Sequence, residues 1–180
     1  MNAEESQRPL RLKRHLPRLD PEAYRGEKHV SFTATVLRRQ HLFTSHEVVD
    51  ASIAALREQC QSHERECLVY CFMPDHVHMI MHGLCQRSDS LEAHNDWKGA
   101  TGKVLAHHYP GSQHWQPQSY DHVLRSYEYE RGALRNMIRY ILQNPVRAGL
   151  VAEWQEYPFL GSLIGPCDIR EEAWWDWFYE

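Results

Sequence analysis

Residues 72 to 81, FMPDHVHMIM, predict two β-strands joined by a tight turn. The apolar run of residues 67–73 forms the first strand and ends at the Pro-Asp pair at 74 and 75, and both residue types favour turns. Apolar and imidazole side chains then alternate, so His76, His78 and His82 are expected on one face of the second strand. Two neighbouring imidazoles suit a divalent metal ion, although a chain with 13 histidines also produces such a pair by chance.

A second candidate site lies on the clearest helix of the sequence, which is predicted over residues 128 to 143. Its apolar residues recur at helical spacing and form one stripe of Leu134, Met137, Ile138 and Ile141. Pro145 is expected to end the helix by pushing Asn144 away from helical geometry. Tyr140 and Asn144 are four residues apart, and therefore share a face one turn apart, away from the stripe. Alternatively, Tyr140 is a helix-edge residue with its hydroxyl in water, and Asn144 is a helix cap.

The remaining periodic segments complete an α+β pattern around these two stretches. Strands are predicted at residues 29–36, 67–73 and 119–125, and helices at residues 48–61 and 90–108. This order fits a ferredoxin-like or RRM-like antiparallel sheet with helices packed on it.

Composition limits the class of protein. A chain of 180 residues with 42% hydrophobic content is expected to form one compact domain, and a net charge of -4 argues against indiscriminate coating of nucleic acid. Five cysteines without a CxxC pair argue against a disulfide framework or a zinc knuckle. The sequence contains neither a membrane-spanning apolar segment nor a GxxxxGK[ST] motif. We therefore expect a cytoplasmic protein without a nucleotide cofactor.

Three segments, in order, resemble motifs of one protein family. The segment FMPDHVHMIM at 72–81 resembles the HUH strand of REP-associated tyrosine transposases, and YILQNPVRAGLV at 140–151 resembles their tyrosine helix. Between them, WQPQSYDHVLR at 115–125 resembles the intervening part of the same proteins. The resemblance extends from about His29 to Val151, and the family is similar to the HUH-type single-tyrosine transposases of small bacterial insertion sequences.

This resemblance implies the HUH endonuclease fold and a metal-dependent transesterase that cleaves and rejoins single-stranded DNA. Tyr140 would be the nucleophile that forms a 5′-phosphotyrosine link, and Mg²⁺ or Mn²⁺ would bind to His76, His78 and Asn144. Many insertion-sequence relatives have Gln where Asn144 stands. The implied partner is hairpin DNA from repetitive extragenic palindromes, bound by a monomer rather than a homodimer.

The ends of the chain differ from the central domain, which is predicted at residues 28–151. Residues 1–27 contain three prolines and a basic run, and are expected to form an arm. Residues 152–180 form an acidic, aromatic tail. This tail either docks on the domain as a last helix or occupies the DNA-binding groove.

Further side chains are candidates for DNA contacts because they are basic or aromatic and lie on the predicted arm, the fourth strand or the last helix. They are Arg8, Arg11, Lys13, Arg14, Tyr120, His122 and Arg139. Two other functions remain open on this pattern. One is a protein that binds hairpin DNA without cutting it, and the other is a metal phosphodiesterase in which water replaces the tyrosine.

Overall fold

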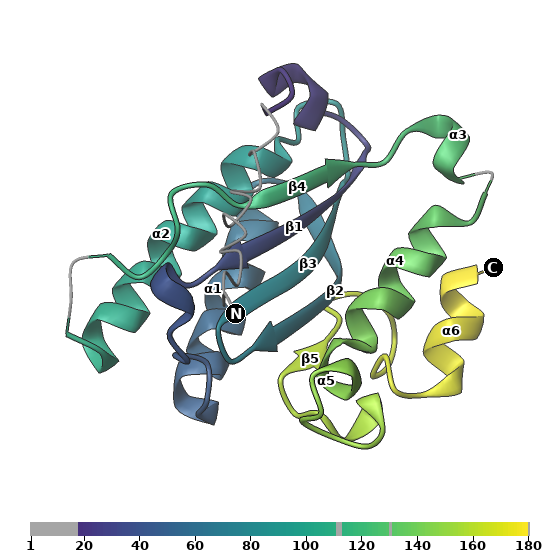
Figure 1. The fold of residues 1–180 in the computed structure, drawn as a ribbon. Helices are drawn as coiled ribbons and strands as arrows, with labels where there is room; N and C mark the ends of the chain where they lie inside the picture. The colour runs from purple at the N-terminus through teal and green to yellow at the C-terminus, as the bar shows by residue number, and fades with distance from the viewer. Residues whose placement is uncertain (1–17, 111–112, 130, 180) are drawn as a thin grey trace, which may run out of the picture.

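The computed structural model describes residues 18–110, 113–129 and 131–179, and it confirms the α+β prediction (Figure 1). One antiparallel sheet has the strand order β4-β1-β3-β2-β5. The strands are β1 (His29–Thr35), β2 (Arg65–Met73), β3 (His76–Gly83), β4 (Tyr120–Val123) and β5 (Leu160–Gly161). The longer helices are α1 (His46–Ser62), α2 (Ser90–His108), α4 (Ala133–Leu142) and α6 (Glu172–Tyr179). The short helices are η1 (Pro21–Tyr24), η2 (Leu37–Arg39), α3 (Ser126–Tyr129), α5 (Asn144–Arg147) and η3 (Trp154–Glu156).

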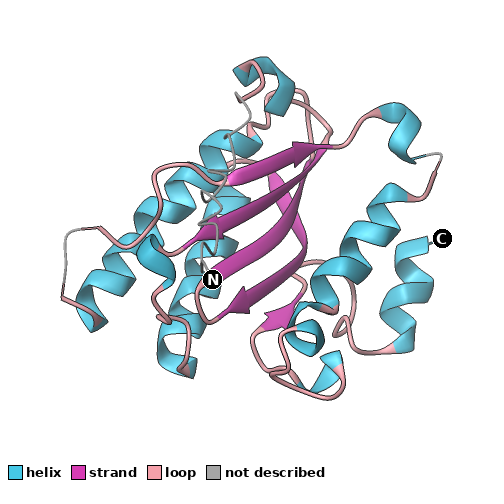
Figure 2. Cartoon of the chain, viewed as in Figure 1, coloured by secondary structure: helices cyan, strands magenta, loops and turns pink. Residues whose placement is uncertain are grey.

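The helices form layers on the central sheet (Figure 2). Helices α1 and α2 contact each other and lie against one face, where Phe32 of β1 stacks on His94 of α2 and Phe72 of β2 meets Trp97. Alternate residues of β3, Val77 and Met79, are fully buried, as the alternation predicts. Helix α4 packs on the opposite face of the sheet, against β2 and β3, so among the described residues this face is open over β1 and β4.

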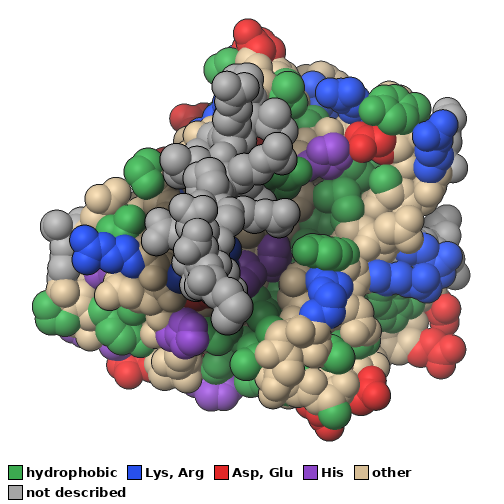
Figure 3. Space-filling view, in the orientation of Figure 1, with side chains coloured by type: hydrophobic (Ala, Val, Ile, Leu, Met, Phe, Trp, Pro, Cys, Tyr) green, Lys and Arg blue, Asp and Glu red, His purple; other side chains and the backbone are tan. Residues whose placement is uncertain are grey.

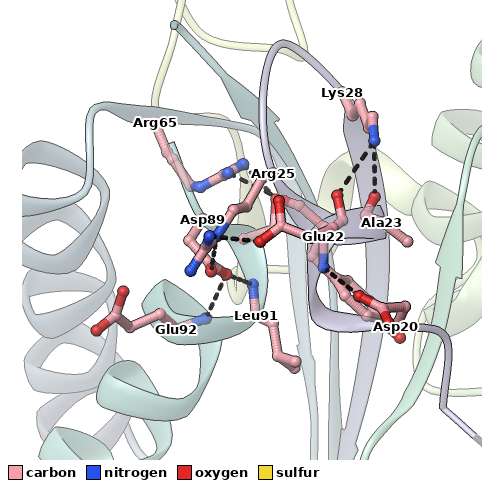
Figure 4. A network of polar contacts seen from close by, with 11 residues as sticks. Asp20, Glu22, Ala23, Arg25, Lys28, Arg65, Asp89, Leu91 and Glu92 are labelled. Carbon is pink, nitrogen blue, oxygen red and sulfur yellow. Dashed lines mark hydrogen bonds and ion pairs between the residues drawn. The ribbon is translucent and has the colours of Figure 1, made fainter. Parts of the chain in front are cut away.

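The described part of the N-terminal lead-in, from Arg18, packs on the domain instead of extending from it. Tyr24 is fully buried, and its hydroxyl donates a hydrogen bond to Asp121 of β4. Figure 4 shows how this segment is fixed: Arg25 forms an ion pair with Asp89, whose side chain also caps α2. Buried Arg65 donates to the Tyr24 carbonyl. The core therefore begins before Lys28, although the sequence predicts its start at that residue. The local sequence does not show this, because the burial of Tyr24 depends on strands that are distant along the chain.

The C-terminal segment is also part of the domain. Strand β5 extends the sheet beyond β2, and Trp174 of α6 is fully buried, with its indole N–H donating to the Ile164 carbonyl at 3.1 Å. Arg170 donates hydrogen bonds to the carbonyls of Tyr157 and Leu160. The tail thus docks as a last helix at the β5 end of the sheet, and it does not occupy the open face over β1 and β4 (Figure 1).

The predicted single helix at 128–143 is divided in the structure. Gly132, with a left-handed φ of 68°, separates α3 from α4. The predicted apolar stripe is confirmed where it meets the sheet, since Ile138 and Ile141 of α4 are buried. The expectation for Asn144 is wrong, because Asn144 begins the helical turn α5 and Pro145 lies in its first turn, where no N–H is needed.

The sequence predicts neither a disulfide framework nor a membrane-spanning segment. All five cysteines are free thiols, and Cys60, Cys67 and Cys71 are buried. Among the helices of the described residues, none combines the length and the apolar character that crossing a membrane requires.

Candidate active site

The open face of the sheet carries a row of polar side chains. Side chains on β1 alternate between buried and half-exposed, and Thr33 lies on the half-exposed face. The strand register places Thr33 opposite both His78 on β3 and Tyr120 on β4, and His122 follows two residues after Tyr120 on the same face. In the space-filling view, histidine side chains lie in a recess between the sheet and α4 (Figure 3).

His76 and His78 face each other at the start of β3. Their Nε2 atoms are 3.1 Å apart, and their rings are nearly perpendicular, with an interplanar angle of 87°. The tight turn before them is held in place by backbone bonds, because the Asp75 carbonyl accepts from the Val36 N–H and the Pro74 carbonyl from the Leu42 N–H. The turn therefore fixes where the strand begins and which residues face the open side.

Each imidazole has a partner that fixes its ring. His76 Nδ1 lies 2.6 Å from the Asp75 carboxylate, which also accepts a 3.0 Å bond from Arg39. Burial acts to raise the pKa of Asp75, but the hydrogen bonds from His76 and Arg39 outweigh it, so the pKa lies below its ordinary value. His78 Nδ1 lies 2.9 Å from the Thr33 hydroxyl. Because a carboxylate only accepts, His76 Nδ1 is the donor in its hydrogen bond to Asp75, and this contact turns His76 Nε2 toward His78.

The charge state of His78 follows from its surroundings. Burial, together with the charges of His76 and Arg147, lowers the pKa of His78 to about 3. The ring is therefore neutral at neutral pH, which is the form that binds metal ions.

Tyr140 reaches this histidine pair from α4. The helix buries Ile138 and Ile141 against the sheet, so Tyr140 lies at the helix edge with 57% of its surface exposed. Its ring meets the His78 ring edge to face, with centroids 6.2 Å apart. A helix that packs on β2 and β3 thus brings a phenol next to the imidazole pair, and the exposed side of that phenol remains accessible to a substrate.

Asn144 lies one turn after Tyr140, as the spacing predicts. Its amide nitrogen donates to the carbonyls of Tyr140 and Ile141, at 3.2 and 3.3 Å. Its amide oxygen accepts a 2.9 Å bond from Arg147. In the described ranges, no group of three or more His, Cys, Asp or Glu side chains could hold a metal ion. A third protein ligand for an ion at the histidine pair would therefore be an amide or a hydroxyl.

The candidate DNA contacts differ in position. Arg8, Arg11, Lys13 and Arg14 lie outside the described residues. Tyr120 is 66% exposed on the open face, and His122 beside it is held by Glu128, with His122 Nε2 3.0 Å from the carboxylate. Arg139 is exposed on α4, immediately before Tyr140. Tyr120 and His122 thus share a face with the histidine pair.

Sequence reasoning did not identify three residues that shape this site. Asp75 and Arg147 had a local signal, because Asp75 directly precedes His76 and Arg147 follows Tyr140 by two helical turns. Thr33 had none, since its contact with His78 depends on the pairing of β1 with β3.

Comparisons with known proteins bear on the family and the fold of this chain. A sequence profile of the family described as "Transposase IS200 like" matches residues 26–144, a range that includes both histidines, Tyr140 and Asn144. No curated protein sequence matches the chain. The structure of a REP-associated tyrosine transposase bound to a REP hairpin has a similar fold, with a TM-score of 0.62, 23% identity and coverage of 81% of each chain.

A candidate transposase from Deinococcus radiodurans R1 gives a TM-score of 0.42 at 21% identity, over 69% of this chain and 97% of that one. The profile match spans well over half of the 180 residues. The chain therefore belongs to the IS200-like transposase family, and it is an enzyme that cuts and transfers DNA strands.

Proposed function

We propose that this transposase cleaves and rejoins single-stranded, hairpin-forming DNA through a covalent link to Tyr140. The observation that supports it most is the contact of the Tyr140 ring with His78, whose Nε2 faces that of His76 at 3.1 Å. Hairpin DNA is the proposed substrate because a transposase of similar fold was solved with a REP hairpin. The protein is proposed to act as a monomer.

The residues at the histidine pair fit a divalent ion. Two nitrogens with facing lone pairs repel unless a proton or a cation lies between them. Adjacent ligands of an octahedral ion, each at about 2.1 Å, lie about 3.0 Å apart, and the two Nε2 atoms are 3.1 Å apart. His76, His78 and Asn144 would hold the ion, and the nitrogen ligands favour Mn²⁺ over Mg²⁺ in affinity. When bound, the ion would offset the negative charge that develops on the scissile phosphate.

The chain's own residues perform the transfer in two balanced steps. The Tyr140 oxygen forms a bond to phosphorus, the bond from phosphorus to the 3′ oxygen breaks, and that oxygen takes a proton from solvent and leaves as a 3′ hydroxyl. The phenolic proton passes to solvent, which reaches Tyr140 because the side chain is 57% exposed. A second 3′ hydroxyl then attacks phosphorus and restores the phenol, so rejoining consumes no nucleotide.

The test is a cleavage assay on labelled single-stranded oligonucleotides that contain a palindromic hairpin and a single-stranded flank. With Mn²⁺ or Mg²⁺ we expect a denaturant-resistant protein-DNA adduct, which disappears in Tyr140→Phe and persists in the control Tyr129→Phe. Cutting by Tyr140→Phe without an adduct would indicate attack by water. Binding without cutting of a REP-type hairpin panel would indicate a hairpin-binding protein, and either result would overturn the proposal.

A further inference from the structure

Arg147 contacts both of the predicted site residues on the last helices. Its guanidinium carbon lies 4.0 Å above the centre of the Tyr140 ring, in a cation-π contact. Its Nη2 atom donates hydrogen bonds to the Tyr140 carbonyl at 2.7 Å and to the Asn144 amide oxygen at 2.9 Å. One cation therefore connects the proposed nucleophile to the proposed amide ligand.

The orientation of the Asn144 amide follows from its other contacts. Pro145 has no N–H, so the Ile141 carbonyl cannot receive its usual helical bond, and the Asn144 amide nitrogen donates to it instead. Rotating the amide by half a turn would place its oxygen against two carbonyl oxygens, and its nitrogen against the guanidinium. Without DNA, the Asn144 amide oxygen is therefore held as the acceptor of the hydrogen bond from Arg147.

The same oxygen is the proposed ligand of the divalent ion. A guanidinium and a divalent ion that share one oxygen repel each other strongly at such a short distance. The Arg147 nitrogens Nε and Nη1 make no hydrogen bond within the described part of the chain. Arg147 is exposed, so these donors are accessible to phosphate oxygens, which guanidinium groups bind well.

We propose that Arg147 is a positioning residue that exchanges partners when DNA binds. Without DNA, it holds the Tyr140 ring and the Asn144 oxygen. When the scissile phosphate arrives, the guanidinium turns to the phosphate and releases the Asn144 oxygen to the ion. This inference rests on the proposed function, and it makes metal binding and DNA binding mutually reinforcing.

The experiment measures Mn²⁺ affinity by titration calorimetry, with and without a hairpin oligonucleotide, in a Tyr140→Phe background that cannot cleave. We expect DNA to tighten Mn²⁺ binding by about tenfold in this parent protein. Arg147→Met removes the competitor, so Mn²⁺ alone should bind about fivefold more tightly and DNA should add little. The control Arg57→Met removes the same charge from an exposed position on α1, and it should behave like the parent.

A second variant separates the exchange from a simple effect of charge. If Arg147 acts through the Asn144 oxygen, Arg147→Met should not change Mn²⁺ affinity further in an Asn144→Ala background. A change of equal size in both backgrounds would mean that the guanidinium acts only through its field, and would overturn the exchange. If DNA tightens Mn²⁺ binding by the same factor in the parent and in Arg147→Met, the exchange is also overturned. Adduct formation by the unmodified enzyme would still support the proposed function in that case. If the parent binds no Mn²⁺ with or without DNA, the exchange is overturned, and the adduct assay on the unmodified enzyme decides the proposed function separately. Thermal unfolding of each variant verifies that the fold is intact.

Discussion

The open face of the sheet holds two pairs of histidines with different geometry. At the start of β3, His76 and His78 are nearly perpendicular, and their Nε2 atoms face each other at 3.1 Å. Near its end, His82 stacks on His29 of β1, with ring centroids 4.2 Å apart and an interplanar angle of 10°. The first pair brings ring nitrogens together, whereas the second brings ring faces together. Residue type and exposure alone therefore do not define an ion site.

The two pairs differ because their partners differ. Asp75 and Thr33 hold the first pair by its Nδ1 atoms. In the second pair, His29 Nδ1 lies 2.8 Å from the Tyr129 hydroxyl, and His82 Nδ1 lies 3.6 Å from Glu66. Each pair also has a tyrosine nearby, but burial raises the pKa of Tyr129, which weakens it as a nucleophile. The comparison predicts that only the first pair supports chemistry.

The largest expected effect comes from removing one histidine from each pair. We expect His78→Ala to lower the rate of DNA cleavage by more than about 100-fold and His82→Ala by less than about threefold, because His78 would bind the ion and His82 would not. Single-turnover cleavage of a hairpin oligonucleotide measures both rates. Losses of similar size in the two variants would mean that the pairs do not differ in function.

A smaller effect is expected from the carboxylates that accompany the two pairs. Asp75→Asn should weaken Mn²⁺ binding by about 10- to 100-fold, because the carboxylate orients His76 and makes its Nε2 more basic. Excess Mn²⁺ should therefore restore cleavage. The matched variant Glu66→Gln, beside His82, should leave Mn²⁺ affinity unchanged. Equal losses of affinity would contradict the assignment of the ion to the first pair.

The smallest effect concerns stability in acid, because each pair contains a histidine whose pKa is lowered by burial. Burial, with the charge of His82, lowers the pKa of His29 to about 3, from an ordinary value of 6.5. Between these values the unfolded chain binds more protons, so the stabilisation is complete above pH 6.5 and is lost as the pH falls toward 3. From pH 7 to 5, His29→Phe should lose about 1 kcal/mol less stability than the parent, after allowance for solvent screening. Urea unfolding at the two pH values measures this difference, and identical losses would contradict it.

The sequence predicted those features that depend on local periodicity. Alternation along β3 places His76 and His78 on one face, and the apolar stripe of α4 leaves Tyr140 at the edge. It could not distinguish His78 from His82, because the difference lies in side chains from β1 and β2. Strand β5, which has two residues, is too short to show any alternation.

The last helices and the lead-in show the same limit. Proline removes a donor, but the sequence does not reveal that Asn144 replaces it and turns its oxygen to Arg147. Tyr24 follows a proline and a charged residue, a local sequence that does not predict burial. Its full burial depends on contacts with β4 and α2 that form only in the folded domain.

The most direct test identifies the tyrosine that carries DNA after cleavage. Digestion of the adduct with trypsin and nuclease should release residues 140–147, YILQNPVR, with the mass of a nucleotide added to Tyr140. Fragmentation by mass spectrometry assigns the modified side chain. Nucleotide on residues 126–131, which include Tyr129, would place the reaction at the stacked histidine pair and contradict the proposed mechanism.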